Sequence, residues 1–282
     1  MPLKACLIFS TAFLAAAQMQ TPVVFDVASV KPSRLRLADG QKGEGSTAAS
    51  VVEADHLTFR ARGLHLFGLI VIAYGLKSCR PLIADSCPML SGGPAWLARD
   101  TFDIDARSPA GSKEYDTIQL RNGNAPQMQE ELRNLLADRF HLKAHFEERQ
   151  LPVYAFTVAD GGVRIKKATA GESSPRIIFK GVDLPGGVHA TQVIAVQSTI
   201  QELADLYAKF MDRPVVDATG LTDRFDFTVQ YDLDPDTSGP FAGATSPTLF
   251  AAFERQAGLK LRATKGPVNV LVIDSAARPS AN

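Results

Sequence analysis

Hydrophobic and polar positions follow two regular patterns between residues 198 and 231. Apolar residues first recur at the spacing of one helical face, at Ile200, Leu203, Leu206, Tyr207 and Phe210. Phe225, Phe227 and Val229 then alternate with polar residues, as in a half-buried strand. The stretch is predicted to form a helix, a short strand, a turn and a second strand, and it contains no catalytic motif.

The same two patterns predict the remaining elements of the chain. Strands are expected over residues 25–33, 56–62 and 101–106, and helices over 66–75, 126–138 and 247–257. Two hairpins are also expected, one with arms at 141–147 and 152–158, the other with arms at 259–263 and 268–274. The Gly-, Lys-, Ser- and Pro-rich residues 161–187 are expected to connect two halves, with a short strand at 176–180.

The two halves repeat one plan. Leu66, Leu69 and Ile72 match Ile200, Leu203 and Leu206, TFDI at 101–104 matches RFDF at 224–227, and Leu142-Lys143 matches Leu259-Lys260. The prediction is an α+β fold of two related modules, each a small mixed or antiparallel sheet with two helices on one face. The first module spans 18–160, with an N-terminal strand and insertions, and the second spans 188–282. The alternative is chance similarity of two amphipathic segments.

The N-terminus reads as a secretory signal peptide over residues 1–17. Lys4 precedes an apolar run from Ala5 to Ala17, and small residues end the run before polar Gln18. The run of about 13 residues is short of the roughly 20 that cross a bilayer, so no span is expected after processing. The alternative is an uncleaved anchor. The protein is therefore expected in the periplasm or outside the cell.

Composition narrows the class of partner. The chain has 282 residues, 45% of them hydrophobic, which is too apolar for a disordered protein. Its 30 Lys+Arg balance 30 Asp+Glu, and loss of Lys4 with the signal changes this by one charge. That balance does not favour a nucleic-acid or anionic-membrane partner. Cys6 leaves with the signal, and Cys79 and Cys87 are expected to form a disulfide in an oxidising compartment.

Several residues suggest chemistry but have a simpler reading. His141 and His145 lie on one face of an expected strand, about 13 Å apart, too far to share a metal ion. Ser46 and Ser91 lack the Gly-x-Ser-x-Gly motif of a serine hydrolase and read as turn residues. The carboxylates Asp212, Asp217, Asp223 and Asp226 read as turn and strand-face residues. No catalytic residue, metal ligand or cofactor is predicted.

A candidate ligand or partner surface remains at Trp96 with Gly92 and Gly93. The lone Trp could cap a groove, and the alternative is a side chain that fills the core. Edge strands of a small sheet are a second candidate surface, because their unpaired backbone groups can accept a partner strand.

Several segments carry a family resemblance. They include FDVASVKPS, SGGPAWL, DTFDI, LLADRFHLKAHFEERQLPVYAFTV, DRPVVDATGLTDRFDFTVQYD and GLKLRATKGPVNVLVID. On these segments the chain resembles an uncharacterised family of exported soil-bacterial proteins, expanded in acidobacteria. In some relatives a similar region follows a membrane-bound peptidase of the antibiotic-sensor type. A weaker resemblance is to the short N-terminal domains of secretins and TonB-dependent receptors, which bind other periplasmic proteins.

Together these observations predict an exported, non-catalytic interaction module of the bacterial envelope, acting in sensing or transport. Its expected partner is another envelope protein that binds through a sheet edge. The alternative is an envelope hydrolase whose site is not marked by a local motif.

Overall fold

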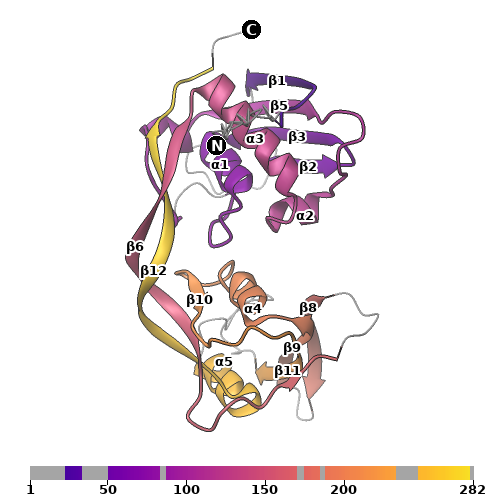
Figure 1. Ribbon diagram of the computed structural model, residues 1–282, viewed down its shortest axis with the longest axis vertical. Helices are drawn as coiled ribbons and strands as arrows, with labels where there is room; N and C mark the ends of the chain where they lie inside the picture. Colours follow the sequence, from indigo (N-terminus) through magenta and orange to yellow (C-terminus); the bar gives the residue numbers. More distant parts are fainter. Residues whose placement is uncertain are drawn as a thin grey trace, which may run out of the picture.

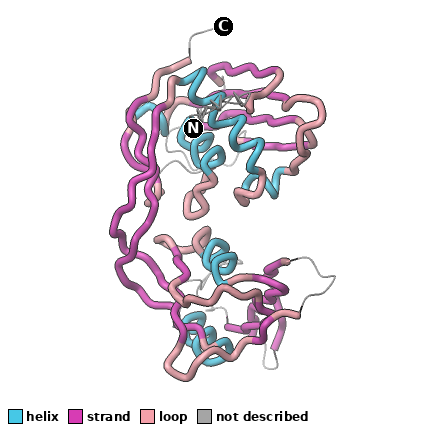
Figure 2. Tube along the Cα trace, in the orientation of Figure 1, coloured by secondary structure: helices cyan, strands magenta, loops and turns pink. Residues whose placement is uncertain are grey.

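The computed structural model describes residues 23–33, 50–82, 87–169, 175–184, 188–232 and 247–279. The expected signal peptide and Ser46 lie outside these residues. The described chain contains helices and three four-stranded sheets, which confirms the α+β class (Figures 1 and 2). Two of the sheets belong to two lobes, and the third forms a long ribbon along one side of both lobes (Figure 1).

The N-terminal lobe is built on an antiparallel sheet. Its strands lie in the order β1 (Val27–Pro32), β5 (Thr101–Arg107), β3 (Thr58–His65) and β2 (Val51–Asp55). Its helical elements are α1 (Leu66–Tyr74), the 3-10 turn η1 (Ala95–Ala98), α2 (Thr117–Arg121) and α3 (Pro126–Phe140). Inward-facing strand residues such as Phe59 and Ile104 share one apolar core with α1 and α3.

Helix α1 is the central helix of this lobe. It contains no charged residue, and all but two of its nine residues are buried. Two side chains of α3 secure its last turn: Gln129 Nε2 donates to the Ile72 carbonyl at 3.0 Å and Arg133 Nη1 to the Ala73 carbonyl at 2.8 Å. The Ala73 carbonyl at the helix end thereby gains a donor, and the Ile72 carbonyl gains a second donor besides the Gly75 amide at 3.2 Å. The C-terminal end of α1 therefore has a fixed position.

The C-terminal lobe has its own antiparallel sheet. Its strands lie in the order β7 (Lys166–Lys167), β11 (Phe225–Asp232), β9 (Val188–Ser198) and β8 (Arg176–Leu184). Its helices are α4 (Ile200–Tyr207) and α5 (Pro247–Ala252), which continues into a π-helical turn, η2 (Phe253–Ala257). Strands β7 and β8 lie within the segment that the sequence predicts to connect two halves, and both pair into this sheet.

A side-chain cap and an aromatic cluster organise this lobe. Thr199 and Glu202 form a capping box at the start of α4, which fixes where the helix begins. Tyr207 is buried at the other end of α4, with its ring 6.4 Å from Phe156 and 5.5 Å from Phe253. Of the apolar positions predicted for this helix, Ile200, Leu203 and Tyr207 are buried in the core, whereas Leu206 is only partly buried.

The two predicted hairpins are wrong, as the third sheet shows. Each hairpin is a single continuous strand, β6 (Lys143–Val158) or β12 (Leu259–Ser275), and these two strands pair antiparallel with each other. Strand β10 (Val215–Asp217) joins the outer edge of β6, and β4 (Leu90–Gly92) joins the outer edge of β12, both in parallel. The central β6–β12 pairing thus joins residues more than one hundred positions apart.

Proline does not interrupt these strands because its nitrogen points out of the ribbon. The Tyr154 amide donates outward to Pro214 at 2.9 Å, and the Leu271 amide donates outward to Met89 at 2.8 Å. Pro152 and Pro267 lie an even number of residues away on the same strands, so their nitrogens also face outward. A missing N–H there removes no bond between β6 and β12.

Each ribbon strand contributes to both lobes. Strand β6 follows α3 of the N-terminal lobe and ends at Phe156 and Val158, and Phe156 is part of the C-terminal core. Strand β12 begins at Leu259 in the C-terminal core and ends with Leu271 and Ile273 in the N-terminal core. Each lobe therefore contains apolar side chains from both halves of the chain.

In each lobe, an aspartate accepts a backbone hydrogen bond at an irregularity in the strand that precedes a helix. Asp103 Oδ1 accepts from the Gly63 amide at 2.8 Å, and Asp226 Oδ1 accepts from the Gln197 amide at 2.7 Å. Gly63 and Gln197 both have positive φ, 60° and 46°, and the register shifts beside each of them. These irregularities direct the chain from β3 into α1 and from β9 into α4.

We expect Asp103→Ala and Asp226→Ala each to lower the free energy of unfolding by about 1–3 kcal/mol, since each leaves a backbone amide without its charged acceptor. Asparagine keeps an acceptor oxygen and should cost less than about 1 kcal/mol. Chemical denaturation measures both, with the exposed Asp138→Ala as control. Equal losses for alanine and asparagine would show that these bonds do not hold the irregularities.

Candidate functional site

Two adjoining cavities lie where the lobes face each other, and together they form the inter-lobe cleft. One has a volume of about 320 Å³ and the other about 350 Å³. Both are lined by Lys77, Asn122 and Lys209. The first volume is at the lower end of the range for small-molecule sites. The cleft can therefore take a small ligand that contacts both lobes.

The first cavity, the apolar pocket, lies mainly in the N-terminal lobe. Its apolar lining comes from α1, the segment after α1, and α2, and includes Val71, Ile72, Leu76, Pro81, Leu82 and Leu120. Its basic residues are Lys77, Arg80, Arg121 and Lys209, and none of the described residues that line it is acidic. An apolar surface surrounded by positive charge is therefore exposed to a ligand.

The second cavity, the polar pocket, lies on the other side of the shared residues. It is lined from the C-terminal lobe by Arg176, Ser198, Glu202, Asp205 and Leu206, and from the N-terminal lobe by Asn124. The Ser198 hydroxyl donates toward two backbone carbonyls, those of Arg176 at 3.0 Å and Val196 at 2.9 Å. Ser198 therefore has a structural role at the end of β9.

Two polar contacts join the lobes across the cleft. The Lys77 ammonium pairs with the Asp205 carboxylate of α4, and Lys209 Nζ donates to Asn122 Oδ1 at 2.6 Å. Burial lowers the pKa of the Lys209 ammonium, the positive charge of Lys77 lowers that pKa further, and Asp205 acts in the opposite direction. Lys209 is thus a half-buried cation whose hydrogen-bond partner here is a neutral amide.

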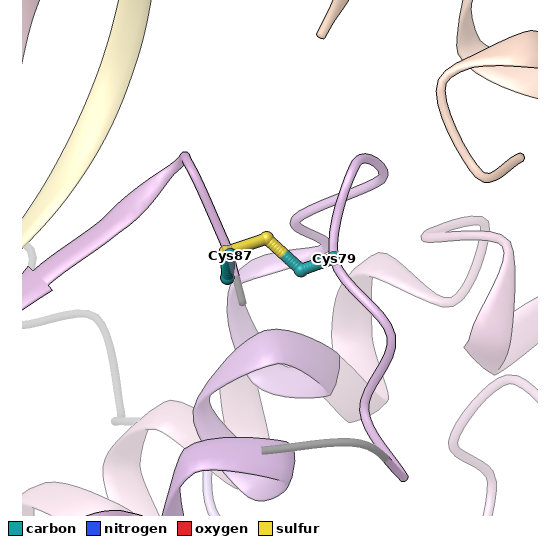
Figure 3. Close-up of a disulfide and its surroundings, with 2 residues drawn as sticks. All are labelled: Cys79 and Cys87. Atoms are coloured by element: carbon teal, nitrogen blue, oxygen red, sulfur yellow. A yellow bond between two sulfur atoms is a disulfide. The ribbon is translucent and has the colours of Figure 1, made fainter. Parts of the chain in front are cut away.

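The disulfide holds the segment that lines the apolar pocket. Cys79 and Cys87 are bonded, with their Cα atoms 4.8 Å apart, and Figure 3 shows the bond joining the segment after α1 to the segment that leads into β4. Cys79 is buried and lines the pocket. A methyl group on Gly68 of α1 would lie 2.1 Å from the Pro81 carbonyl oxygen, so this loop packs directly on the helix.

Trp96, Gly92 and Gly93 lie together beside the ribbon, away from the lining of the cleft. The Trp96 ring is half-buried, meets Phe102 edge-to-face at 6.4 Å, and has the Arg278 guanidinium 5.1 Å above it. A Cβ on Gly92 would lie 2.7 Å from the Ile273 carbonyl oxygen, and one on Gly93 would lie 2.4 Å from Leu97. These glycines permit β4 and η1 to approach β12 closely; a ligand surface at these residues stays a prediction.

The two histidines do not share a strand. His141 ends α3 in the left-handed conformation, and His145 lies in β6 with its Nδ1 3.0 Å from an Asp274 carboxylate oxygen. The Ser91 hydroxyl in β4 accepts a hydrogen bond from Arg149 Nη1 at 3.0 Å. No group of three His, Cys, Asp or Glu that could hold a metal ion occurs among the described residues.

The structure does not bring the four candidate carboxylates together at one chemical site. Asp212 pairs with Arg213 and Asp223 with Lys167 on the surface, while Asp217 accepts from the Thr219 amide and hydroxyl within a turn. Asp226 holds the Gln197 amide. Each carboxylate thus has a local role as an ion-pair partner or a backbone acceptor.

The residues of the cleft were not identified from the sequence. Lys77, Asn122 and Lys209 follow the ends of three helices, and only the arrangement of the lobes brings them together. One signal was present: Lys77 and Arg80 flank Cys79 shortly after an apolar helix. Cations beside a disulfide loop next to an apolar helix indicate a charged rim on an apolar surface.

Fold and cleft together define a two-lobed α+β protein with a small-molecule-sized site between its lobes. Among the described residues, no helix has both the length and the apolar character needed to cross a membrane. The family model described as "Protein of unknown function (DUF3738)" matches residues 68–276, and the chain belongs to this family. No curated protein and no solved structure matches the chain.

Proposed function

We propose that the protein is a non-catalytic binding protein that takes a ligand in the inter-lobe cleft. The observation that carries this proposal is the apolar pocket, whose lining comes from the N-terminal lobe and from Lys209 of the C-terminal lobe. A ligand there removes apolar surface from water and contacts both lobes at once. Ligand binding can thereby change how firmly the lobes are held together, which suits a sensing role.

The test is a screen of a chemically varied fragment library against the whole protein by NMR. Bound fragments should shift the amide signals of Leu76, Lys77 and Lys209. Leu82→Trp, at an exposed position of the pocket lining, should abolish these shifts, and Val27→Trp on the exposed face of β1 should not. A ligand site in the cleft would be refuted if the fragments shifted only amide signals from other regions, or if the shifts were unchanged in Leu82→Trp.

The same experiment separates binding from the alternative, an envelope hydrolase. A binding protein returns each bound fragment unchanged, whereas a hydrolase converts bound ester or amide fragments into products. Product signals that depend on the protein would favour the hydrolase.

We also propose that the protein is exported. The apolar run before Gln18 and the bonded cysteines support this, since disulfides persist in oxidising compartments. Export predicts that protein from its native host begins near Gln18. N-terminal sequencing that finds Met1 would contradict it.

A second envelope protein is proposed to bind at the edge of β8. This strand pairs with β9 on one side within its sheet, and Ile178 on it is 44% exposed. An added strand would extend the sheet at β8 and contact Ile178. A photo-reactive residue at position 178 should cross-link to one envelope protein in the native host, and a lack of any product would refute the interaction.

The two lobes are proposed to be related modules. The paired roles of Asp103 and Asp226 support this. The order strand, helix, short strand, strand, helix, long strand also occurs from β9 to β12 and, with η1 and α2 as additional elements, from β3 to β6. Related modules predict that the alanine variants of the two aspartates lose similar stability. A loss confined to one lobe would contradict the relationship.

A further inference from the structure

Positive charge is concentrated at the apolar pocket although the chain as a whole is neutral. The whole sequence has 30 Lys+Arg and 30 Asp+Glu, whereas the described lining of this pocket contains four basic residues and no acidic one. Two of these residues, Lys77 and Arg80, belong to the segment after α1, Arg121 ends α2, and Lys209 follows α4. Clefts lined by one sign of charge concentrate ligands of the opposite sign.

Lys77 and Lys209 lie near one carboxylate, Asp205, because Glu202, the other acidic residue of the polar pocket, pairs with Arg224. Asp205 Oδ2 pairs with Lys77, and Asp205 Oδ1 accepts from the Gln201 amide at 2.8 Å. Lys209 instead donates to the neutral oxygen of Asn122. The half-buried junction of the two pockets therefore has excess positive charge among the described residues, and an anionic group placed there gains a charge-assisted hydrogen bond.

The surface of the apolar pocket beside this junction favours uncharged, apolar groups. Val71, Ile72, Leu76 and Leu120 are buried side chains that line the pocket and offer no charged group to a ligand. Apolar parts of a ligand gain from leaving water at this surface. The pocket volume of about 320 Å³ fits a medium-length chain or a small ring system.

We propose that the inter-lobe cleft binds an amphipathic anion, with its apolar chain or ring in the apolar pocket and its single anionic group beside Lys209 and Lys77. This proposal rests on the binding function proposed above and specifies the chemical class of its ligand. The shared chemistry is that of a fatty-acid-like carboxylate, sulfonate or phosphate monoester.

The test compares three probes that share one chain length and differ in charge: decanoate, decanol and decyltrimethylammonium. Isothermal titration of the whole, disulfide-bonded protein, below the concentrations at which these probes form micelles, measures their dissociation constants. We expect decanoate to bind at least about tenfold more tightly than the other two, the factor given by one charge-assisted contact.

Two variants test where the anionic group lies. Asn122→Asp gives Lys209 an internal carboxylate, and Lys209→Met removes the ammonium while keeping an unbranched side chain. Each should weaken decanoate binding about tenfold and so reduce the difference between the dissociation constants of decanoate and decanol. Asn269→Asp, at an exposed position of β12, adds the same charge away from the pocket lining and should change neither constant. Circular dichroism checks that each variant is folded.

The outcomes separate this proposal from the proposed function. The proposal of an anionic ligand would be wrong if all three probes bound with equal dissociation constants, or if neither variant changed the dissociation constant of decanoate. The cleft would then still be a binding site. If none of the three probes binds but library fragments still occupy the cleft, the ligand class is likewise wrong. If fragments also fail to bind there, the binding function itself is wrong.

Discussion

Replacing Phe102 or Phe225 with alanine is expected to lower the free energy of unfolding by about 3–5 kcal/mol. Both side chains are almost fully buried, Phe102 in the N-terminal core and Phe225 in the C-terminal core. The Phe102 ring meets Phe140 of α3 edge-to-face at 4.9 Å, so its removal also ends a contact between sheet and helix. Urea denaturation followed by far-ultraviolet circular dichroism measures the loss.

Phe146→Ala is the matched control, because it makes the same chemical change at a residue of β6 that is 53% exposed. Its cost should be below about 1 kcal/mol, since little apolar surface returns to water. If Phe102→Ala or Phe225→Ala costs no more than this control, the assignment of these residues to the two cores is wrong.

Gly258→Ala is expected to cost at least about 3 kcal/mol, although it adds one methyl group. Gly258 ends η2 with φ of 65°, which costs a residue with a side chain about 1 kcal/mol. Its added Cβ would lie 2.1 Å from the Gly162 carbonyl oxygen, so the turn at residues 159–164 must move. Two backbone hydrogen bonds join that turn to the end of the helix, Ala159 N to Gly258 O at 2.9 Å and Arg164 N to Ala257 O at 3.0 Å, and both would be strained.

Gly220→Ala isolates the backbone part of this effect. Gly220 has φ of 71°, and among the described residues no heavy atom beyond its own chain neighbours lies within 4 Å of the position its Cβ would take. We expect a loss of about 1 kcal/mol there, in the same denaturation experiment. Equal losses at the two glycines would mean that the turn adapts freely and that its packing on the helix end adds no stability.

The sequence was sufficient to predict elements whose pattern is local. Helix α4 shows one apolar face at regular spacing, β5 and β11 alternate around Phe102 and Phe225, and α3 begins with Pro126 as expected. In each case the periodicity of a single segment specifies both the type of element and its buried face. Helix boundaries were within a few residues for the same reason.

The ribbon could not be predicted this way, because its partners are chosen by tertiary structure. The apparent turn signal at Lys265-Gly266-Pro267 suggested a hairpin within one segment. In the fold these residues pair with Gln150, Leu151 and Pro152, and the chain continues straight. Turn residues show only that a segment is able to form a turn. Here the long-range pairing of β12 with β6 determined that the segment is an extended strand.

The candidate site was missed for a related reason. Trp96, Gly92 and Gly93 attract attention in the sequence because such residues are rare or conformationally special, and the structure places them in close packing near β12. Lys77, Asn122 and Lys209 are ordinary residues after helix ends. They become notable only when the two lobes face each other across the cleft.

Because β12 belongs to the cores of both lobes, the N-terminal lobe can finish folding only after this strand has been synthesised. Leu271 and Ile273 are part of its core, yet the ribosome adds them only after the described helices and the other described strands of both lobes. A nascent chain that has produced α1 and α3 still exposes the apolar surface that β12 will cover. The N-terminal lobe therefore stays incompletely folded until β12 is made. A chain released before Leu271 lacks core residues of the N-terminal lobe, and one released before Leu259 lacks core residues of both lobes.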